Sequence, residues 1–86
     1  MDINELISTV KKKIRDSISL EKIDVEDKTF LHKNHKSHEI GKFHLKLIIT
    51  SLELKKMSKI ESTKKIYNIL DKELKTHIHS IQILIL

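Results

Sequence analysis

The sequence contains no cysteine, no proline and a single glycine, Gly41, among its 86 residues. The lack of cysteine excludes disulfide bonds, thiol nucleophiles and any thiolate metal site built by this chain alone. A bound metal would therefore need histidine, carboxylate or the thiolates of a partner as ligands. The lack of proline, together with the one glycine, leaves no flexible linker, low-complexity segment or internal repeat.

Aromatic residues and long apolar runs are also scarce. The three aromatics, Phe30, Phe43 and Tyr67, are too few and too scattered to form a base-stacking platform. No run approaches the ~20 apolar residues that a membrane helix requires. Asp2 and Glu5 are acidic where a secretory signal is basic, so we expect a cytoplasmic protein with no membrane contact.

The charged residues, 34% of the chain, give a net charge of +5 that is spread over the whole sequence. A spread of this kind predicts nucleic-acid binding less often than a single basic tract does. The triplet at residues 11–13 is interpreted as a solvated helix face, with a phosphate or acidic-partner contact as the less favoured alternative. The length predicts one domain, residues 1–86, that buries roughly 60–65% of its unfolded surface.

Two segments have the spacing of amphipathic helices. The first follows Asp2, which can form a capping box with Glu5, and should end near residues 17 to 19. The second follows Ser58, which repeats the motif with Glu61, and should end near Lys75. The stripes predicted to face the core are Ile3, Leu6, Ile7, Val10, Ile14 and Ile18 in the first helix, and Ile60, Lys64, Tyr67, Leu70 and Leu74, joined by Ile66 and Ile69, in the second.

Three segments have the composition of strands. Residues 22–26 and 43–50 alternate in hydropathy, which predicts an antiparallel pair. Residues 76–86 form the most apolar and β-branched stretch, which predicts a strand in the interior of a sheet, parallel to the second because the connection is long. Residues 51–56 read as a turn or a short helical piece. The fold class is therefore α+β, a two-layer domain with helices on one face of a three-stranded mixed sheet.

The long segment between the first two strands, residues 27–42, carries His32, His35 and His38. A long loop with several metal-competent side chains is more often functional than an arbitrary insertion. His35 and His38 are either solvated or are secondary candidates for binding a metal such as zinc or nickel.

Three further histidines lie at strand starts. His44 lies just inside the second strand, and we interpret His44 and His77 as structural or exposed. His79 stands at the entrance to the last strand, in a position from which its side chain should point outward. Judged by itself, a strand-entry histidine is more often hydrogen-bonded to backbone than a ligand.

These segments resemble the BolA-like family, in register over nearly the whole chain. The resemblance is carried by the runs at residues 25–32, 44–46 and 64–67, and most specifically by Ile78, His79, Ser80 and Ile81. That last run has the family's pattern of apolar residue, histidine, small residue and apolar residue. The resemblance implies an α-β-β-α-α-β arrangement similar to class II KH domains.

The resemblance also implies a function. It implies partnership with a monothiol glutaredoxin in iron–sulfur cluster assembly, trafficking or iron sensing, through a shared [2Fe–2S] cluster with glutathione supplied by the glutaredoxin. The family's metal ligands match His79 and His32. Histidine can replace cysteine on one iron of such a cluster. Because a ligating imidazole must be neutral, and its intrinsic pKa is ~6.5, cluster retention should fall in mild acid. We expect a monomer when free and a heterodimer with the partner.

The alternative function is a DNA-binding transcriptional regulator of stress response and cell morphology, a role that the resemblance also implies. Its candidate nucleic-acid or partner contacts are Lys59, Lys64 and Lys65. The Gly-x-x-Gly loop that clamps nucleic acid in KH domains cannot form with one glycine, so DNA binding should be weak and salt-dependent. No nucleophile–base or carboxylate pair has a recognisable motif, so we predict that the protein is not an enzyme.

Two departures from the family pattern affect these expectations. Ser62 and Thr63 stand where the family often has an Arg-His pair, which weakens a DNA-contact role for that helix. Lys56 stands where a glycine often follows the second strand, which leaves the turn geometry there open.

Overall fold

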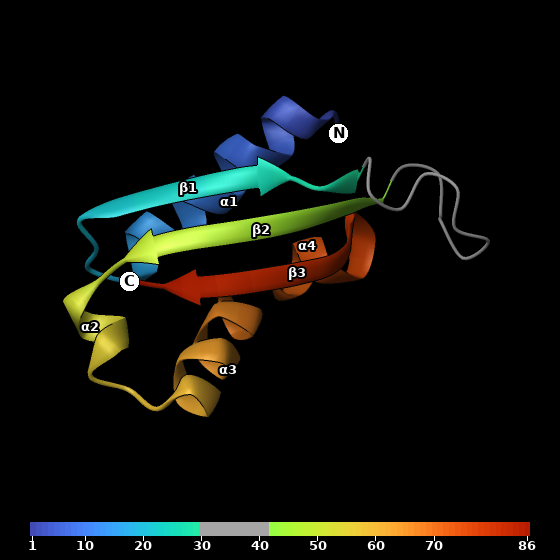
Figure 1. Ribbon diagram of the computed structural model, residues 1–86. Coiled ribbons are helices and arrows are strands. Elements are labelled where there is room, and N and C mark those ends of the chain that lie inside the picture. Colours follow the sequence, from blue (N-terminus) through green and yellow to red (C-terminus); the bar gives the residue numbers. More distant parts are fainter. Residues whose placement is uncertain (30–41) are drawn as a thin grey trace.

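The computed structural model describes residues 1–29 and 42–86 (Figure 1). Helix α1 and strands β1 and β2 are followed by three helical segments and strand β3. The bounds are α1 Ile3–Ser17, β1 Lys22–Asp27, β2 Phe43–Thr50, α2 Leu52–Lys55, α3 Lys59–Ile69, α4 Asp71–Thr76 and β3 Ile78–Ile85. None of the helices in these two ranges is long and apolar enough to cross a membrane.

The three strands form one sheet in the order β1-β2-β3, and the helices lie on one face of it (Figure 1). Strand β1 is antiparallel to β2, and β3 is parallel to β2. The predicted α+β class, the antiparallel pair and the parallel crossover are therefore confirmed.

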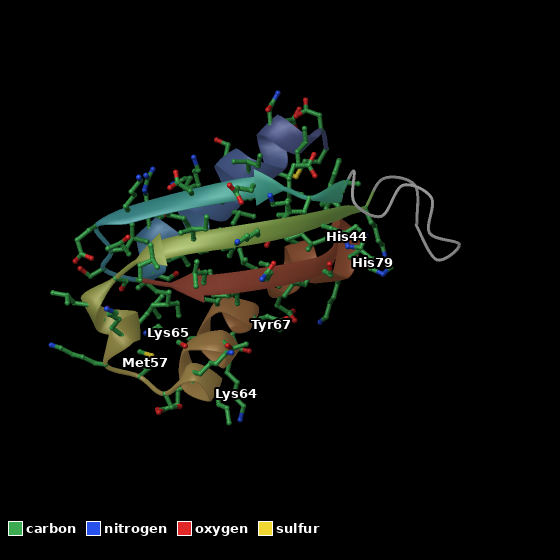
Figure 2. All side chains as sticks on the ribbon, viewed as in Figure 1. His44, Met57, Lys64, Lys65, Tyr67 and His79 are labelled. Atoms are coloured by element: carbon green, nitrogen blue, oxygen red, sulfur yellow. The ribbon has the colours of Figure 1, made fainter. Side chains whose placement is uncertain are left out.

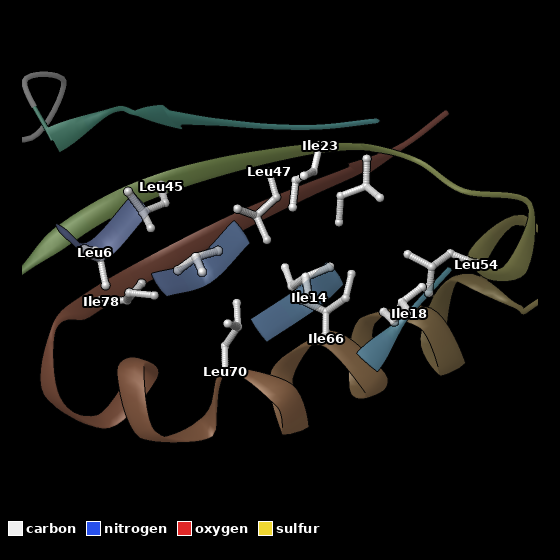
Figure 3. Packing of buried hydrophobic residues seen from close by; sticks show 12 residues of the cluster. Leu6, Ile14, Ile18, Ile23, Leu45, Leu47, Leu54, Ile66, Leu70 and Ile78 are labelled. Carbon is white, nitrogen blue, oxygen red and sulfur yellow. The ribbon is translucent and has the colours of Figure 1, made fainter. Parts of the chain in front are cut away.

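The hydrophobic core fills the space between the helices and the covered face of the sheet (Figure 3). Helix α1 and strand β2 together supply half of its buried residues, as their spacing predicts. The buried core residues are Leu6, Val10, Ile14, Ile18, Ile23, Leu45, Leu47, Ile49, Leu54, Ile66, Leu70 and Ile78.

The prediction that the last strand is an interior strand is wrong, because β3 lies at the edge of the sheet. Its residues from Ile81 onward alternate between half-buried and exposed, and Leu84 is 42% exposed. The helices cover only one face of the sheet (Figure 1). A strand in this position can therefore be apolar in composition while only one of its faces is packed.

The predicted single helix ending near Lys75 is divided at Leu70. There the backbone has φ −98° and ψ 16°, outside the helical region, and α4 begins at the next residue. Backbone hydrogen bonds nevertheless continue across the break, from Leu70 N–H to Ile66 and from Leu74 N–H to Leu70. The Leu70 side chain is completely buried. No glycine or proline marks this break, so the local sequence gives no signal for it.

The predicted buried face of the second helix is also partly wrong. Ile66 is buried as predicted, but Ile60 is 70% and Tyr67 is 42% exposed, and the buried Ser62 was not predicted to face the core. The Ser62 hydroxyl donates to the Lys59 carbonyl oxygen at 3.1 Å, so this polar side chain can be buried with its hydrogen bond satisfied. The inward face therefore includes a polar residue that a hydropathy pattern assigns to solvent.

Both predicted helix starts have their caps. The Ser58 and Glu61 side chains each accept a hydrogen bond from the other residue's backbone N–H, which is a complete capping box. Asp2 accepts from the Glu5 N–H at 2.8 Å.

One residue of the lysine triplet is not on a solvated face. Lys13 Nζ donates to both carboxylate oxygens of Glu73, at 2.9 and 2.7 Å, and so joins α1 to α4. The Glu73 side chain is only 5% exposed. The prediction for this lysine is therefore wrong, because the sequence pattern did not show that α4 buries a carboxylate against α1.

Candidate functional site at the start of strand β3

His79 is the extra residue in a bulge between β2 and β3. Ile78 pairs with Phe43, and Ser80 pairs with His44, so that no residue of β2 lies opposite His79. A bulge leaves its extra residue outside the ladder and redirects its side chain. The Ile78 side chain points into the core, whereas His79 is exposed. The bulge therefore presents an imidazole to solvent at the start of a strand that is anchored in the core.

The ring of His44 lies beside the ring of His79 (Figure 2). The two ring centroids are 4.8 Å apart and the planes are tilted by 35°. His44 is only 7% exposed, and its Nδ1 is 2.6 Å from the Ser80 hydroxyl oxygen. A buried ring held by the residue next to His79 therefore supports one side of the exposed imidazole.

The end of β1 fixes the backbone of His44. The His44 N–H donates to the Thr29 hydroxyl oxygen at 3.2 Å, and the His44 carbonyl oxygen accepts from the Lys28 N–H at 2.7 Å. The Thr29 hydroxyl in turn donates to the Asp27 carboxylate. All three strands therefore contribute to the position of the two rings.

A shallow cavity of about 200 Å³ adjoins His44 and Ser80. Lys28, the residue after β1, lines it together with Lys46 of β2 and Gln82 of β3. Lys28 also pairs with Glu26 at 3.4 Å. The cavity walls therefore carry positive charge next to the histidine pair.

Of the predicted metal ligands, the structure describes His79 only. His79 is exposed at the bulge, where a second molecule could reach it. His32, His35 and His38 lie outside the described residues. Within residues 1–29 and 42–86, no group of three histidine or carboxylate side chains could hold a metal ion. A metal bound at His79 would therefore need further ligands from outside the described residues.

His44 is the residue whose place at this site the sequence did not reveal. Its interpretation as structural or exposed did not include a contact with His79. One signal was present in the spacing of the last strand, where Ile78 and Ile81 are three apart, while Ile81, Ile83 and Ile85 are two apart. An odd spacing between inward residues indicates an inserted residue, and hence a bulge at the histidine.

The three candidate contact lysines do not share one environment. Lys59 and Lys64 are exposed, and neither forms an ion pair with a described residue. Lys65 is half-buried, and its Nζ is 3.2 Å from a carboxylate oxygen of Glu53. The Lys65 hydrogen bond, with a smaller contribution from the Ser19 backbone N–H, lowers the pKa of the Glu53 carboxyl below its usual value. Lys65 is therefore already engaged within the protein.

The sequence profile of the family described as "BolA-like protein" matches residues 14–86. The chain belongs to the BolA-like family. No curated protein with which the sequence was compared is significantly similar to it.

Solved structures of BolA proteins share this fold. The BolA domain of SufE1 from Arabidopsis thaliana superposes with a TM-score of 0.82 at 23% identity, over 98% of this chain and 93% of that one. BolA1 from Arabidopsis thaliana gives 0.75 at 21% identity, over 92% and 87%. BolA1 from Mus musculus gives 0.73 at 16% identity, over 92% and 62%. The fold of this BolA-like chain is thus retained at low sequence identity.

Proposed function

We propose that this BolA-like protein is a non-enzymatic partner of a monothiol glutaredoxin, with which it shares a [2Fe–2S] cluster through His79. The observation that carries the proposal is the exposed imidazole at the bulge, held on a strand at the sheet edge. A ligand to a shared cluster must be rigid on its own protein and open to the partner. His79 meets both conditions.

The donor chemistry of the chain fits a shared cluster. With no cysteine, the chain can contribute no thiolate, and histidine ligands on one iron are chemically established. The remaining thiolate ligands would come from the glutaredoxin cysteine and its glutathione. We propose His32 as the second ligand from this chain. The cluster, when bound, supplies the iron that is transferred or sensed.

The residues around His79 act by positioning it. His44 packs against the His79 ring, and Ser80 holds the His44 ring through its hydroxyl. A supporting contact of this kind fixes the orientation of a ligand without touching the metal. Lys28 and Lys46, which line the adjacent cavity, favour a partner that presents an anionic group there.

The test is anaerobic cluster reconstitution of the protein mixed with a monothiol glutaredoxin, followed by visible absorption and circular dichroism. We expect a heterodimer spectrum distinct from that of the glutaredoxin alone, and we expect His79→Ala to lose or alter it. The matched control is His77→Ala, which removes an imidazole two residues away and should leave the spectrum unchanged. Identical spectra for the wild type and His79→Ala would discard the ligand assignment.

The second ligand can be assigned by the same method. We expect His32→Ala to change the spectrum, and His35→Ala or His38→Ala to leave it as in the wild type. A change with His35→Ala alone would move the second ligand to that position.

One observation favours the alternative function, DNA binding. Lys59 and Lys64 are exposed cations without an ion pair among the described residues. A strong, sequence-selective shift of a promoter fragment at physiological salt would support this function over cluster sharing. Weak binding that disappears as salt is raised would indicate only non-specific phosphate contacts.

A further inference from the structure

A groove of about 330 Å³ lies between the helical layer and the end of β3. Leu54, Met57, Ser62 and Thr63 line it from α2, α3 and the turn between them, and residues 83–85 line it from β3. His79 is the second residue of β3, so the groove lies at the opposite end of the strand (Figure 2). The groove therefore belongs to neither the histidine pair nor the cavity beside it.

The outer edge of β3 runs along this groove. Among the described residues, β3 is paired only with β2. The Leu86 N–H donates to the Ile49 carbonyl oxygen, towards β2. Because backbone groups alternate in direction along a strand, those of Ile83 and Ile85 point away from β2. The groove is thus bordered by backbone donors and acceptors that can pair with another strand.

Lysines lie around the groove, and four of them have no ion-pair partner among residues 1–29 and 42–86. Lys55 and Lys59 line it, and Lys56 and Lys64 are exposed on the same segment. None of the four forms an ion pair with a described residue, whereas six other lysines do. The nearby carboxylates are occupied, since Glu53 pairs with Lys65 and Glu61 belongs to the capping box. The rim of the groove is therefore positively charged.

We propose that this groove binds an extended acidic segment of a partner protein, which adds to the outer edge of β3 as a further strand. The backbone of the segment would pair with Ile83 and Ile85. Its alternate apolar side chains would enter the groove towards Met57, and its carboxylates would meet the lysines of α2 and α3. Strand addition of this kind takes affinity from the backbone and specificity from alternate side-chain pockets.

Two other occupants fit the observations less well. Nucleic acid needs stacking surfaces or a glycine-rich clamp, and the groove is lined by neither aromatic nor glycine residues. A second copy of the chain would bring the same lysines against each other, and like charges at an interface are repulsive. An acidic polypeptide satisfies the charge, the apolar lining and the open backbone edge together.

The test uses a short fluorescent peptide that alternates glutamate and valine, followed by fluorescence polarisation and NMR. We expect saturable binding, with the largest amide shifts at Ile81, Ile83 and Ile85 and smaller ones at Gln82 and Leu84. This alternation is the signature of pairing along the outer edge. The same peptide with alternate backbone nitrogens methylated keeps its charge and side chains but loses its donors, and it should bind at least tenfold more weakly.

The charge requirement is tested with a matched pair of variants. Lys55→Glu combined with Lys59→Glu reverses two charges at the groove and should weaken binding by roughly tenfold or more. Lys11→Glu combined with Lys72→Glu makes the same change in net charge away from the groove and should bind the peptide as the wild type does. All four lysines lack ion pairs among the described residues, so neither variant removes one.

Several outcomes would overturn the proposal. No peptide binding, equal binding of the methylated peptide, or amide shifts without alternation would exclude strand addition. Tighter binding of an oligothymidylate would favour nucleic acid as the occupant, and shifts of the same amides that depend on protein concentration alone would favour a second copy of the chain.

Cluster reconstitution on the Lys55→Glu, Lys59→Glu protein separates this site from the proposed function. A normal [2Fe–2S] spectrum with lost peptide binding would assign the two functions to opposite ends of β3.

Discussion

The His44 and His79 rings lie with their centroids 4.8 Å apart, although the bulge leaves His79 without a pairing partner in β2. The register of β2 and β3 brings the two rings together, because His44 pairs with Ser80 and the Ser80 hydroxyl holds the His44 ring. The Ser80 hydroxyl therefore takes part in holding the His44 ring against His79. A variant that removes the Ser80 hydrogen bond therefore tests the support of the His79 ring without changing His79 itself.

Ser80→Ala should lower the free energy of unfolding by about 1 kcal/mol, because it removes the partner of a mostly buried imidazole nitrogen. The measurement is urea denaturation followed by circular dichroism. Gln82→Ala is the matched control on the exposed face of the same strand and should cost less than ~0.5 kcal/mol. Equal effects of the two variants would show that the hydrogen bond does not hold the His44 ring.

The Lys13–Glu73 pair should respond asymmetrically to substitution. Lys13→Met leaves a carboxylate that is 5% exposed without its cation, which should cost about 3 kcal/mol. Glu73→Gln leaves a lysine that is 37% exposed and can be rehydrated, so the cost should be about 1 kcal/mol. Denaturant unfolding of both variants gives the comparison.

The control for this asymmetry is the neighbouring pair of Lys12 and Asp16, whose side chains are 77% and 65% exposed. Lys12→Met should change stability by less than ~0.5 kcal/mol, because exposed ion pairs contribute little. A larger loss for Glu73→Gln than for Lys13→Met would mean that burial of the carboxylate is not what makes the pair sensitive.

The helix faces show what hydropathy can and cannot predict. The spacing of Leu6, Val10 and Ile14 predicted the buried face of α1 because only apolar side chains are buried there. The same reasoning chose Tyr67 in α3, where the inward face contains Ser62. A polar residue can be buried when a hydrogen bond satisfies it, and that depends on contacts that a hydropathy pattern does not contain.

The candidate site shows the same limit. His79 was predicted as a ligand from a local run of residues, because the strand start and the family pattern are both local. Its contact with His44 depends on the register of two strands that are distant in sequence, and one inserted residue changes that register. The spacing of Ile78 and Ile81 indicated the insertion but not which residue of β2 would lie beside it.

Glu53 should titrate below the usual range for glutamate, because Lys65 lowers its pKa. Its contribution to stability should therefore be present above the pKa of the unfolded chain and be lost as the pH falls through the lower pKa of the folded state. Lys65→Met should raise the pKa of Glu53, as followed by the ¹³C shift of its carboxyl group. Lys64→Met removes the preceding lysine, which has no ion pair with a residue that the structure describes, and it should leave the titration unchanged. An equal shift in both variants would exclude a specific Lys65 effect.

Adjacent residues of α3 provide a direct test of which face of this helix is buried. Ile66 is completely buried in the core, whereas Tyr67 is 42% exposed. Ile66→Ala should therefore lower the free energy of unfolding by about 2–4 kcal/mol, since it removes buried methyl groups and leaves a cavity. Tyr67→Ala should cost less than ~1 kcal/mol, although it deletes a larger side chain. Denaturant unfolding of the two variants gives the comparison, because a greater loss for Tyr67→Ala would mean that Tyr67 belongs to the side that packs on the sheet, as its place in the predicted stripe implied.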